Sequence, residues 1–457
     1  MRDCLLPHCP PDTVPLRLVH QSDYAAWREA QPAHLQSWLA ANRFVATPGA
    51  FCPLPGAGGV LEAVLVIHDD EAGPWTLAGL PQALPEGDYR LAEPVAAERA
   101  AVYALGWALG AYQYTRYKAA KRAPARLALP GVELASVRRQ AEAVALVRDL
   151  INTPAEDMMP EQLAATAEAL ARECGAQLRQ WVGDQLLADN FPTIHAVGRA
   201  SSHAPRLIEL RWGDERHPRV TLVGKGVCFD SGGLDLKPAS GMRLMKKDMG
   251  GAAHALGLAR LIMSEGLPLR LRVLVPAVEN AVSGNAFRPG DVIRTRQGLT
   301  VEIDNTDAEG RLILCDALSE AAAEQPELLV DFATLTGAAR VALGPELPAL
   351  FCNDEGVAAG LAAAAAETQD PLWRLPLHAA YKEYLDSKIA DLANSASGPY
   401  AGAITAALFL QSFVPAGQPW AHLDIMAWNT RNRPGRPEGG EAMGLRAVYA
   451  YLRKRYG

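Results

Sequence analysis

From about residue 205 onward, short apolar runs alternate with longer segments that carry apolar residues at helical spacing. The apolar runs have the length and composition of buried strands, and they lie at Pro205–Trp212, Val220–Phe229, Leu269–Val275, Thr300–Ile303 and Glu327–Phe332. Two longer segments, Gly251–Ser264 and Arg311–Glu324, have the pattern of helices. Strands in alternation with helices predict an α/β domain with a mixed, largely parallel sheet flanked by helices.

The chain has 457 residues, which is too long for one hydrophobic core, because single cores stop growing at roughly 250–300 residues. In residues 1–134, prolines and glycines interrupt short apolar runs, and this favours a small N-terminal α/β domain. A helical pattern over 135–151 predicts a connecting helix, which ends before Pro154 because the residue before proline avoids helical geometry. The larger domain is then expected at 152–457.

Charge and cysteine content argue against several classes of protein. The net charge of -7 argues against nucleic acid and anionic membranes as partners. The seven cysteines are odd in number and show no C-x-x-C spacing, so a disulfide framework and a structural zinc knuckle are both disfavoured. The sequence shows no signal peptide and no apolar run near the ~20 residues that span a bilayer, so we expect a cytoplasmic protein.

Polar residues are concentrated in two loops that follow predicted strands, where ligands of open α/β sheets bind. Lys225 is flanked by glycines inside one strand, Asp230 closes that strand, and Asp248 precedes Gly250-Gly251. In the second loop Asp307 and Glu309 lie two residues apart. In an extended segment that spacing points both carboxylates to one side, together with Arg311.

Each of these residues also has an ordinary structural explanation. Lys225 alone fits a lysine whose ammonium extends from a strand end to the surface, Asp230 a turn, and Asp248 a helix cap. Asp307 and Glu309 fit a charged surface loop. Together, however, these explanations need five coincidences at predicted strand ends, so we expect the four carboxylates to converge.

Four convergent carboxylates repel one another unless cations balance them. Two divalent ions would cancel the charge of Asp230, Asp248, Asp307 and Glu309. A lysine ligand has to be neutral, and nearby cations and burial would both lower the pKa of Lys225. Lys237 and Arg311 would then remain to stabilise developing negative charge. Two-metal sites of this kind activate water for hydrolysis.

The second loop carries the octapeptide Asn-Thr-Asp-Ala-Glu-Gly-Arg-Leu at residues 305–312, which resembles the signature of the leucyl aminopeptidase family. Further similarity to that family is found at Val223–Gly233, Lys237-Pro238, Met245–Met249, Asn152–Pro154, Ala333–Gly337, Ile389–Asn394 and Trp420–Ile425. The resemblance covers about residues 150–430, and we expect the N-terminal domain to lie outside it. The larger domain is therefore interpreted as a catalytic metallopeptidase domain.

The resemblance implies a role for each matching residue. The tighter metal ion would be held by Lys225, Asp230, Asp248 and Glu309, and the more exchangeable one by Asp230, Asp307 and Glu309. Lys237 and Arg311 match the catalytic positions. The implied cofactors are two divalent metal ions per chain (zinc, manganese or cobalt, with magnesium as an alternative) and a bicarbonate ion on Arg311 as general base.

The implied activity is that of a metal-dependent exopeptidase, a hydrolase that removes N-terminal residues, leucine-like ones preferred, from peptides through a two-metal-activated hydroxide. The substrate amine would bind the tighter metal and Asp248, and the scissile carbonyl oxygen the other metal and Lys237. A homohexamer is the oligomer that the resemblance implies.

Two other functions compete with this reading. Some family members also bind DNA, but the acidic net charge and the lack of a long basic stripe argue against that here. An inactive scaffold is disfavoured because every ligand position is intact. The residues after Ile425, Met426–Asn429, differ from the small residues common in the family and indicate a subgroup. Cys228 and Cys315 are expected to be core thiols, and His422 is expected to have a structural role. His195 and His254 are expected to be structural or surface residues and not ligands.

Overall fold

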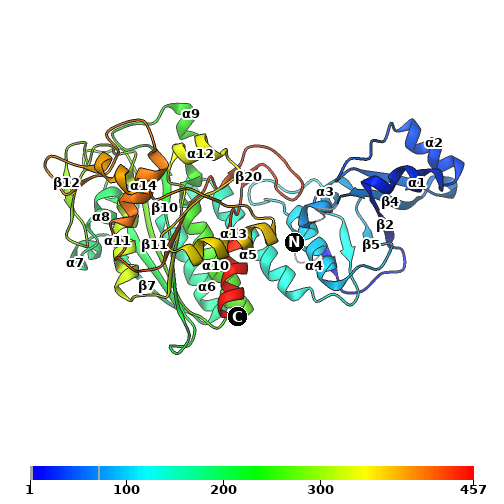
Figure 1. The fold of residues 1–457 in the computed structure, drawn as a ribbon, viewed down its shortest axis with the longest axis horizontal. Coiled ribbons are helices and arrows are strands. Elements are labelled where there is room, and N and C mark those ends of the chain that lie inside the picture. The colour runs from blue at the N-terminus through cyan, green and yellow to red at the C-terminus, as the bar shows by residue number, and fades with distance from the viewer. Residues whose placement is uncertain (1–3, 70–72) are drawn as a thin grey trace. The chain divides into compact units, whose positions relative to one another are not determined.

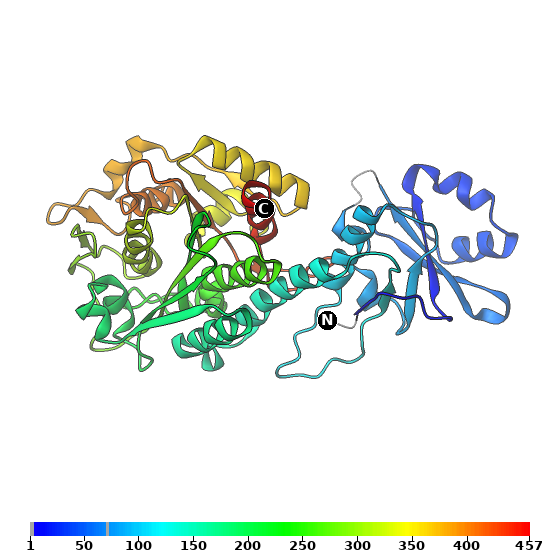
Figure 2. The same ribbon diagram turned by 90° about the horizontal axis from the view of Figure 1, so that it is seen from below.

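The computed structural model describes residues 4–69 and 73–457 (Figures 1 and 2). It divides into two compact units. The first comprises Met1–Ala145 and Arg431–Glu438, and the second comprises Leu146–Thr430 and Gly439–Gly457. The predicted α/β class is confirmed, since each unit has a mixed sheet with helices.

The first unit contains a six-stranded sheet in the order β1-β6-β5-β2-β4-β3. Its strands are β1 (Leu5–Leu6), β2 (Val14–His20), β3 (Phe51–Pro55), β4 (Leu61–His68), β5 (Asp88–Leu91) and β6 (Arg126–Ala128). Its helices are α1 (Tyr24–Glu29), α2 (Ala33–Ala41), α3 (Leu80–Ala83) and α4 (Ala97–Gly110). The most apolar strand, β4, is buried over Ala63–Ile67 and supplies much of the core.

A second part of the chain completes the first unit. The segment Arg431–Glu438, far away in sequence, packs on residues 75–79. The guanidinium carbon of Arg436 lies 3.9 Å from the ring centroid of Trp75. Helix α5 (Ala135–Asn152) begins in the first unit and ends in the second, close to the connecting helix expected from the sequence.

The second unit is built on a nine-stranded sheet in the order β16-β15-β18-β14-β9-β11-β8-β7, with β10 paired to β11. The strands are β7 (Gln177–Val182), β8 (Arg206–Trp212), β9 (Arg219–Gly224), β10 (Gly226–Asp230), β11 (Arg270–Asn280), β14 (Leu328–Ala333), β15 (Ala349–Cys352), β16 (Trp373–Arg374) and β18 (Trp420–Asp424). Its centre, β18-β14-β9-β11, is parallel, while β7 and β8 pair antiparallel at one edge. This matches the predicted mixed, largely parallel sheet.

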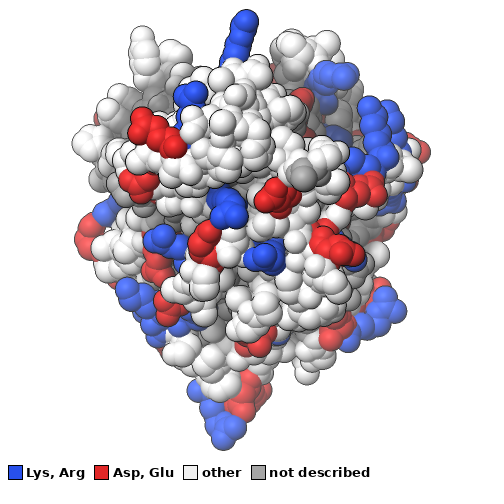
Figure 3. All heavy atoms as spheres, turned by 90° about the vertical axis from the view of Figure 1, so that its right-hand side faces the viewer, with Lys and Arg blue, Asp and Glu red and all other residues white. Residues whose placement is uncertain are grey.

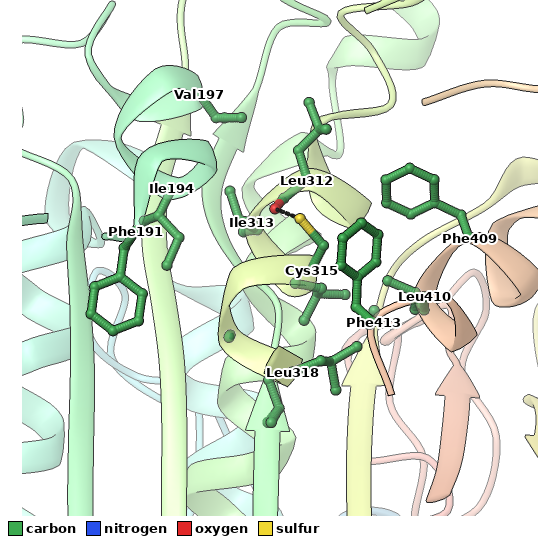
Figure 4. Close-up of a cluster of buried hydrophobic side chains, with 14 of the residues drawn as sticks. Phe191, Ile194, Val197, Leu312, Ile313, Cys315, Leu318, Phe409, Leu410 and Phe413 are labelled. Atoms are coloured by element: carbon green, nitrogen blue, oxygen red, sulfur yellow. Dashed lines mark hydrogen bonds between the residues drawn. The ribbon is translucent and has the colours of Figure 1, made fainter. Parts of the chain in front are cut away.

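Helices pack on this sheet in two groups (Figures 1 and 2). One group contains α6 (Pro160–Cys174), α10 (Gly250–Glu265), α13 (Glu355–Thr368) and α15 (Leu445–Tyr456). The other contains α8 (Pro192–Gly198), α11 (Glu309–Ala323) and α14 (Gly402–Gln411). In Figure 4 apolar side chains of α8 and α11 meet the phenylalanines of α14 and the turn after it, which anchors α11 in the core. Short helices α7 (Gln185–Ala188), α9 (Ala239–Met242) and α12 (Gly337–Leu343) lie in the connections.

One predicted strand does not belong to the main sheet. The run at 300–303 forms β13 (Thr300–Glu302), but β13 belongs to a separate three-stranded sheet with β12 (Val292–Arg294) and β17 (Leu392–Ala393). It follows β12 after a short turn, so the two pair as an antiparallel hairpin. A further small ribbon joins β19 (Trp428–Asn429) to β20 (Gly439–Gly440).

Among the described residues, no helix has both the length and the apolar composition needed to cross a bilayer. On the face drawn in Figure 3, lysine and arginine side chains are interspersed with acidic ones. The charge on that face is thus mixed in sign, which is unlike the basic stripe of a nucleic-acid-binding surface.

Candidate metal centre and catalytic site

Lys225 lies at a break between two strands. The sequence predicts a single strand over Val220–Phe229, but β9 ends at Gly224 and β10 begins at Gly226. The backbone amide of Lys225 donates to the carbonyl of Phe332 (3.0 Å), so the chain stays in the sheet while its side chain enters the interior. Lys225 is only 3% exposed. Its ammonium therefore needs buried partners.

These partners come from three segments. The Lys225 Nζ lies 2.7 Å from Asp248 Oδ2 and 3.0 Å from Glu309 Oε1, and it donates to the carbonyl of Thr334 (3.0 Å). Burial lowers the pKa of Lys225 as the sequence argument expects, but the charges of Asp248 and Glu309 outweigh burial and raise it. The lysine thus pairs with the carboxylates in this structure.

The approach of Lys225 to α11 requires a glycine. A Cβ at Gly310 would lie 2.4 Å from Lys225 Cε and 2.7 Å from its Nζ, which is far inside contact distance. Any larger residue at this position would push the lysine away from Glu309. The glycine of the octapeptide is therefore explained by the space that the lysine needs.

A second lysine pairs with the other carboxylates. The Lys237 Nζ lies 2.8 Å from Asp230 Oδ2 and forms a close ion pair with Asp307. Asp230 is fixed from behind by Asn280 Nδ2 and the amide of Gly232, each 2.9 Å from Asp230 Oδ1. Burial and the neighbouring charge of Asp230 raise the pKa of Asp307 to about 6.

Asp230, Asp307 and Glu309 bring one carboxylate oxygen each to within 4.8 Å of one another. Glu309 is buried among carboxylates, and burial followed by the charge of Asp230 raises its pKa to about 8. Three buried oxygens, Asp248 Oδ2, Asp307 Oδ1 and Glu309 Oε1, accept no hydrogen bond, although a lysine ammonium lies within ion-pair distance of each. Such a set of buried oxygens fits hard divalent cations.

Arg311 reaches the site from a helix. The sequence argument assumed an extended segment over Asp307–Arg311, and that assumption is wrong because Glu309 is the first residue of α11. Arg311 is 8% exposed, and burial lowers its pKa to about 10. Among the described residues, nothing accepts a hydrogen bond from its buried Nε. A buried guanidinium with a free donor fits a small anion such as bicarbonate.

The sequence argument assigned no role to three residues that position the site. Thr334 Oγ1 donates to Asp248 Oδ1 (2.7 Å), and Asn280 holds Asp230. The side chain of Asn394 accepts from the amides of Asp304 and Asn305, which orders the second loop. Asn280 is the last residue of β11, so extending the predicted strand beyond Val275 would have pointed to it.

Four residues that were not assigned as ligands are buried in the structure: Cys228, Cys315, His254 and His422. Cys228 and Cys315 are buried thiols. The His422 Nδ1 lies 2.6 Å from Asp331, and both side chains are buried. The ring of His254 bridges the carbonyl of Gly250 and the amide of Met443.

Models of two protein domains match this chain. Residues 145–449 match the model of the cytosol aminopeptidase family, catalytic domain, and residues 14–130 match that of the M17 aminopeptidase N-terminal domain. The expectation that the first domain lies outside the resemblance is therefore wrong.

Individual relatives agree with these matches. A probable cytosol aminopeptidase of Syntrophotalea carbinolica is 46% identical over 68% of this chain, and the match spans 63% of that relative's length. The crystal structure of cytosol aminopeptidase from Coxiella burnetii has a TM-score of 0.95 at 50% identity, with 100% of both chains covered. The bottromycin maturation enzyme BotP in complex with Mn has a TM-score of 0.87 at 37% identity, over 97% of this chain and 99% of that one. The chain therefore belongs to the cytosol aminopeptidase family of metal-dependent exopeptidases, and it contains both the N-terminal and the catalytic domain of that family.

Proposed function

We propose that the protein is a two-metal leucyl aminopeptidase that removes N-terminal residues, leucine-like ones preferred, from peptides. The observation that carries this proposal is the group of buried carboxylate oxygens that accept no hydrogen bond. It rests also on membership of the family and on the intact octapeptide at residues 305–312.

The donor set supports two ions per chain. Lys225, Asp230, Asp248 and Glu309 would hold the tighter ion. Asp230, Asp307 and Glu309 would hold the more exchangeable one, so that Asp230 and Glu309 bridge. Oxygen-rich ligation with one amine and no thiolate suits zinc, manganese, cobalt or magnesium, and the manganese complex of BotP supports manganese. When bound, such ions polarise a carbonyl group and lower the pKa of water.

Side chains of the protein would bind the substrate amine, stabilise the developing negative charge and hold the general base. Asp248 is the carboxylate assigned to the free amine of the substrate, and it is held in place by Thr334. Lys237, which is partly exposed beside Asp230 and Asp307, would donate to the oxygen of the scissile carbonyl as negative charge develops there. The buried guanidinium of Arg311 would hold bicarbonate, which supplies a general base when bound.

Assembly and location are inferred from the family. We infer a homohexamer, as the family resemblance implies, and peptides as substrates. The names of the curated relatives, which are called cytosol aminopeptidases, support a cytoplasmic protein. The mixed charge of the face in Figure 3 favours a peptidase over a DNA-binding regulator.

The test is a panel of aminoacyl p-nitroanilides assayed before and after chelation. We expect cleavage of the leucine derivative, its loss after dialysis against a chelator, and its return with manganese, cobalt or zinc. Circular dichroism of the chelated protein provides the control that the fold persists. Full activity in protein whose metal content has been measured as zero would contradict the proposal.

A further inference from the structure

A polar cavity lies at the end of the main sheet opposite the candidate site. Its volume is about 340 Å³, which is in the range of small-molecule sites. It is lined by the first residues of β9 and β11 and by the connection between β8 and β9. β9 ends at Gly224, just before Lys225, and β11 ends at Asn280, which holds Asp230. The cavity and the carboxylate cluster are thus at opposite ends of the same two strands.

The register of the strands brings polar side chains onto one face of the sheet. Arg219 is paired with Arg270, and Thr221 with Arg272, in the parallel ladder between β9 and β11. Residues two apart along a strand share a face, so these four side chains lie on the same side of the sheet. Strand β8 adds Arg211, which is opposite Arg272 in the antiparallel ladder. All five residues line the cavity.

Two of the four arginines already have carboxylate partners. Arg272 Nε lies 2.6 Å from Glu209 Oε1, and Arg272 Nη2 lies 2.5 Å from Glu320 Oε1. Arg211 donates to Glu209 (2.8 Å) and forms a close ion pair with Glu324, which directly follows α11. These arginines also offset the partial negative charge at the C-terminal end of that helix. The charges of Arg211 and Arg272 are thus balanced within the protein.

The other two arginines have no comparable partner. The guanidinium of Arg219 forms no hydrogen bond or ion pair with any residue of the described ranges, 4–69 and 73–457. Arg270 has Glu215 at 3.9 Å, but the Glu215 side chain is 88% exposed, so water screens this pair. The cavity therefore contains two positive charges that no carboxylate holds closely.

A buried hydroxyl in the cavity also lacks a partner. Thr221 is only 2% exposed, and its Oγ1 forms no hydrogen bond within the described part of the chain. A buried polar group is costly unless something bonds to it. Gly213 lines the same cavity, and a Cβ there would lie 1.9 Å from the carbonyl oxygen of Leu269. Because this position cannot carry a side chain, room is left for a ligand.

We propose that this cavity binds a small dianion, a phosphate monoester or a dicarboxylate, whose oxygens accept hydrogen bonds from Arg219, Arg270 and Thr221. Guanidinium groups match the oxygens of both phosphate and carboxylate, so the shared chemistry is a doubly charged oxyanion. Its two charges equal those of the two arginines. The site is separate from the metal centre, because the extended chain from Arg219 to Lys225 spans ~20 Å.

Calorimetric titration of the metal-loaded enzyme tests the proposal. Inorganic phosphate and succinate are the probes, at constant ionic strength and in mildly alkaline buffer, where both are dianions. We expect at least one of them to bind with a Kd of ~1 mM or less. Binding of phosphate alone identifies a phosphate-type ligand, and binding of succinate alone identifies a dicarboxylate. Absence of binding by both probes would overturn the proposal.

Variants of the lining residues locate the binding. Arg219→Gln and Arg270→Gln should each raise the Kd by ~10-fold or more, the order of one charge-assisted hydrogen bond. Thr221→Val should raise it ~3–10-fold without lowering the melting temperature, because the hydroxyl has no partner in the free protein. If Thr221→Val fails to fold, the two arginine variants decide. A wild-type Kd in the double variant Arg219→Gln/Arg270→Gln would overturn the proposal.

Two controls exclude other anion sites. Arg216→Gln removes the same charge from an exposed arginine of the β8–β9 connection, one that pairs with Asp214, and should leave the Kd unchanged. Arg311→Ala removes the candidate anion site at the metal centre and should also leave it unchanged. Loss of binding in Arg311→Ala alone would assign the anion to the metal centre and overturn the proposal. Cleavage of leucine p-nitroanilide by the cavity variants at the wild-type rate would show that the two sites are distinct.

Discussion

The ammonium of Lys225 lies 2.7 Å from a carboxylate oxygen of Asp248, and each side chain is only 3% exposed. Solvent therefore screens this pair very little, and loss of either partner would leave a buried charge. Lys225 also contacts Glu309, whose pKa is raised. The position of this one lysine thus links a strand break, the 3₁₀ helix Met245–Met249 that carries Asp248, and the start of α11 in a single network of charges.

The ligand assignments predict which acidic residues control metal content. Asp307→Ala and Glu309→Ala should both lose metal and activity, and Glu309→Ala should lose more metal because Glu309 is fully buried and is assigned to both ions. Asp304→Ala provides the matched control, since Asp304 is exposed in the same loop and binds Ser395. Metal is measured by mass spectrometry on dialysed protein. Unchanged metal content in both variants would show that these residues are not ligands.

Lys237 and Arg311 should matter for turnover and not for metal. Carboxylates and divalent ions already balance in charge, so Lys237→Ala and Arg311→Ala should keep their metal. Loss of an oxyanion donor costs ~10²–10³ in kcat, and loss of a positioned base ~10²–10⁴. Arg311→Ala should also lose the response of the rate to added bicarbonate, while Lys237→Ala keeps it. An emptied metal site in either variant, or near-normal turnover, would refute these roles.

A free substrate amine should be essential. N-acetyl-leucine p-nitroanilide should not be cleaved, because the free amine is assigned to the tighter ion and to the carboxylate of Asp248. That carboxylate is held in place by a hydrogen bond from Thr334. The unblocked substrate in the same assay is the control. Efficient cleavage of the blocked compound would instead indicate an endopeptidase.

His254 should make stability depend on pH. Its Nδ1 donates to the carbonyl of Gly250 (2.6 Å) and its Nε2 accepts from the amide of Met443 (2.8 Å), so the ring is held neutral. Burial lowers its pKa to about 4, below the usual 6.5, so its stabilising effect is complete above pH ~6.5 and is lost as pH falls through 4. The free energy of unfolding should fall by on the order of 3 kcal/mol over this range from this residue alone.

The check is urea unfolding of the wild type and of His254→Gln between pH 4 and 7. Other groups titrate in the same range, so the difference between the two slopes isolates His254. Parallel slopes would mean that the histidine carries no such linkage.

The sequence predicts a site residue only where the local pattern distinguishes that residue from its neighbours. Lys225 stands out because its charge interrupts an apolar run between two glycines, and Asp230 because it closes that run. The central strands follow from their apolar runs. The helix predicted to begin at Arg311 begins two residues earlier, at Glu309, because periodicity does not locate the first residue of a helix. Lys247 and Lys246 are adjacent and chemically alike, and only the fold shows that Lys247 is buried while Lys246 binds the carbonyl of Asn152. Pairing of β13 with β12 and β17 likewise depends on tertiary contacts.

The segment Arg431–Glu438, which packs on residues 75–79 of the first unit, has a consequence for synthesis of the chain. A ribosome adds ~5–20 residues per second, so residues 4–69 and 73–145 leave the ribosome tens of seconds before this segment exists. During that interval the aromatic ring of Trp75 lacks the arginine that covers it. The N-terminal unit can therefore acquire its final surface only when translation is nearly over, and a gene fragment that stops after Ala145 would encode it without this segment.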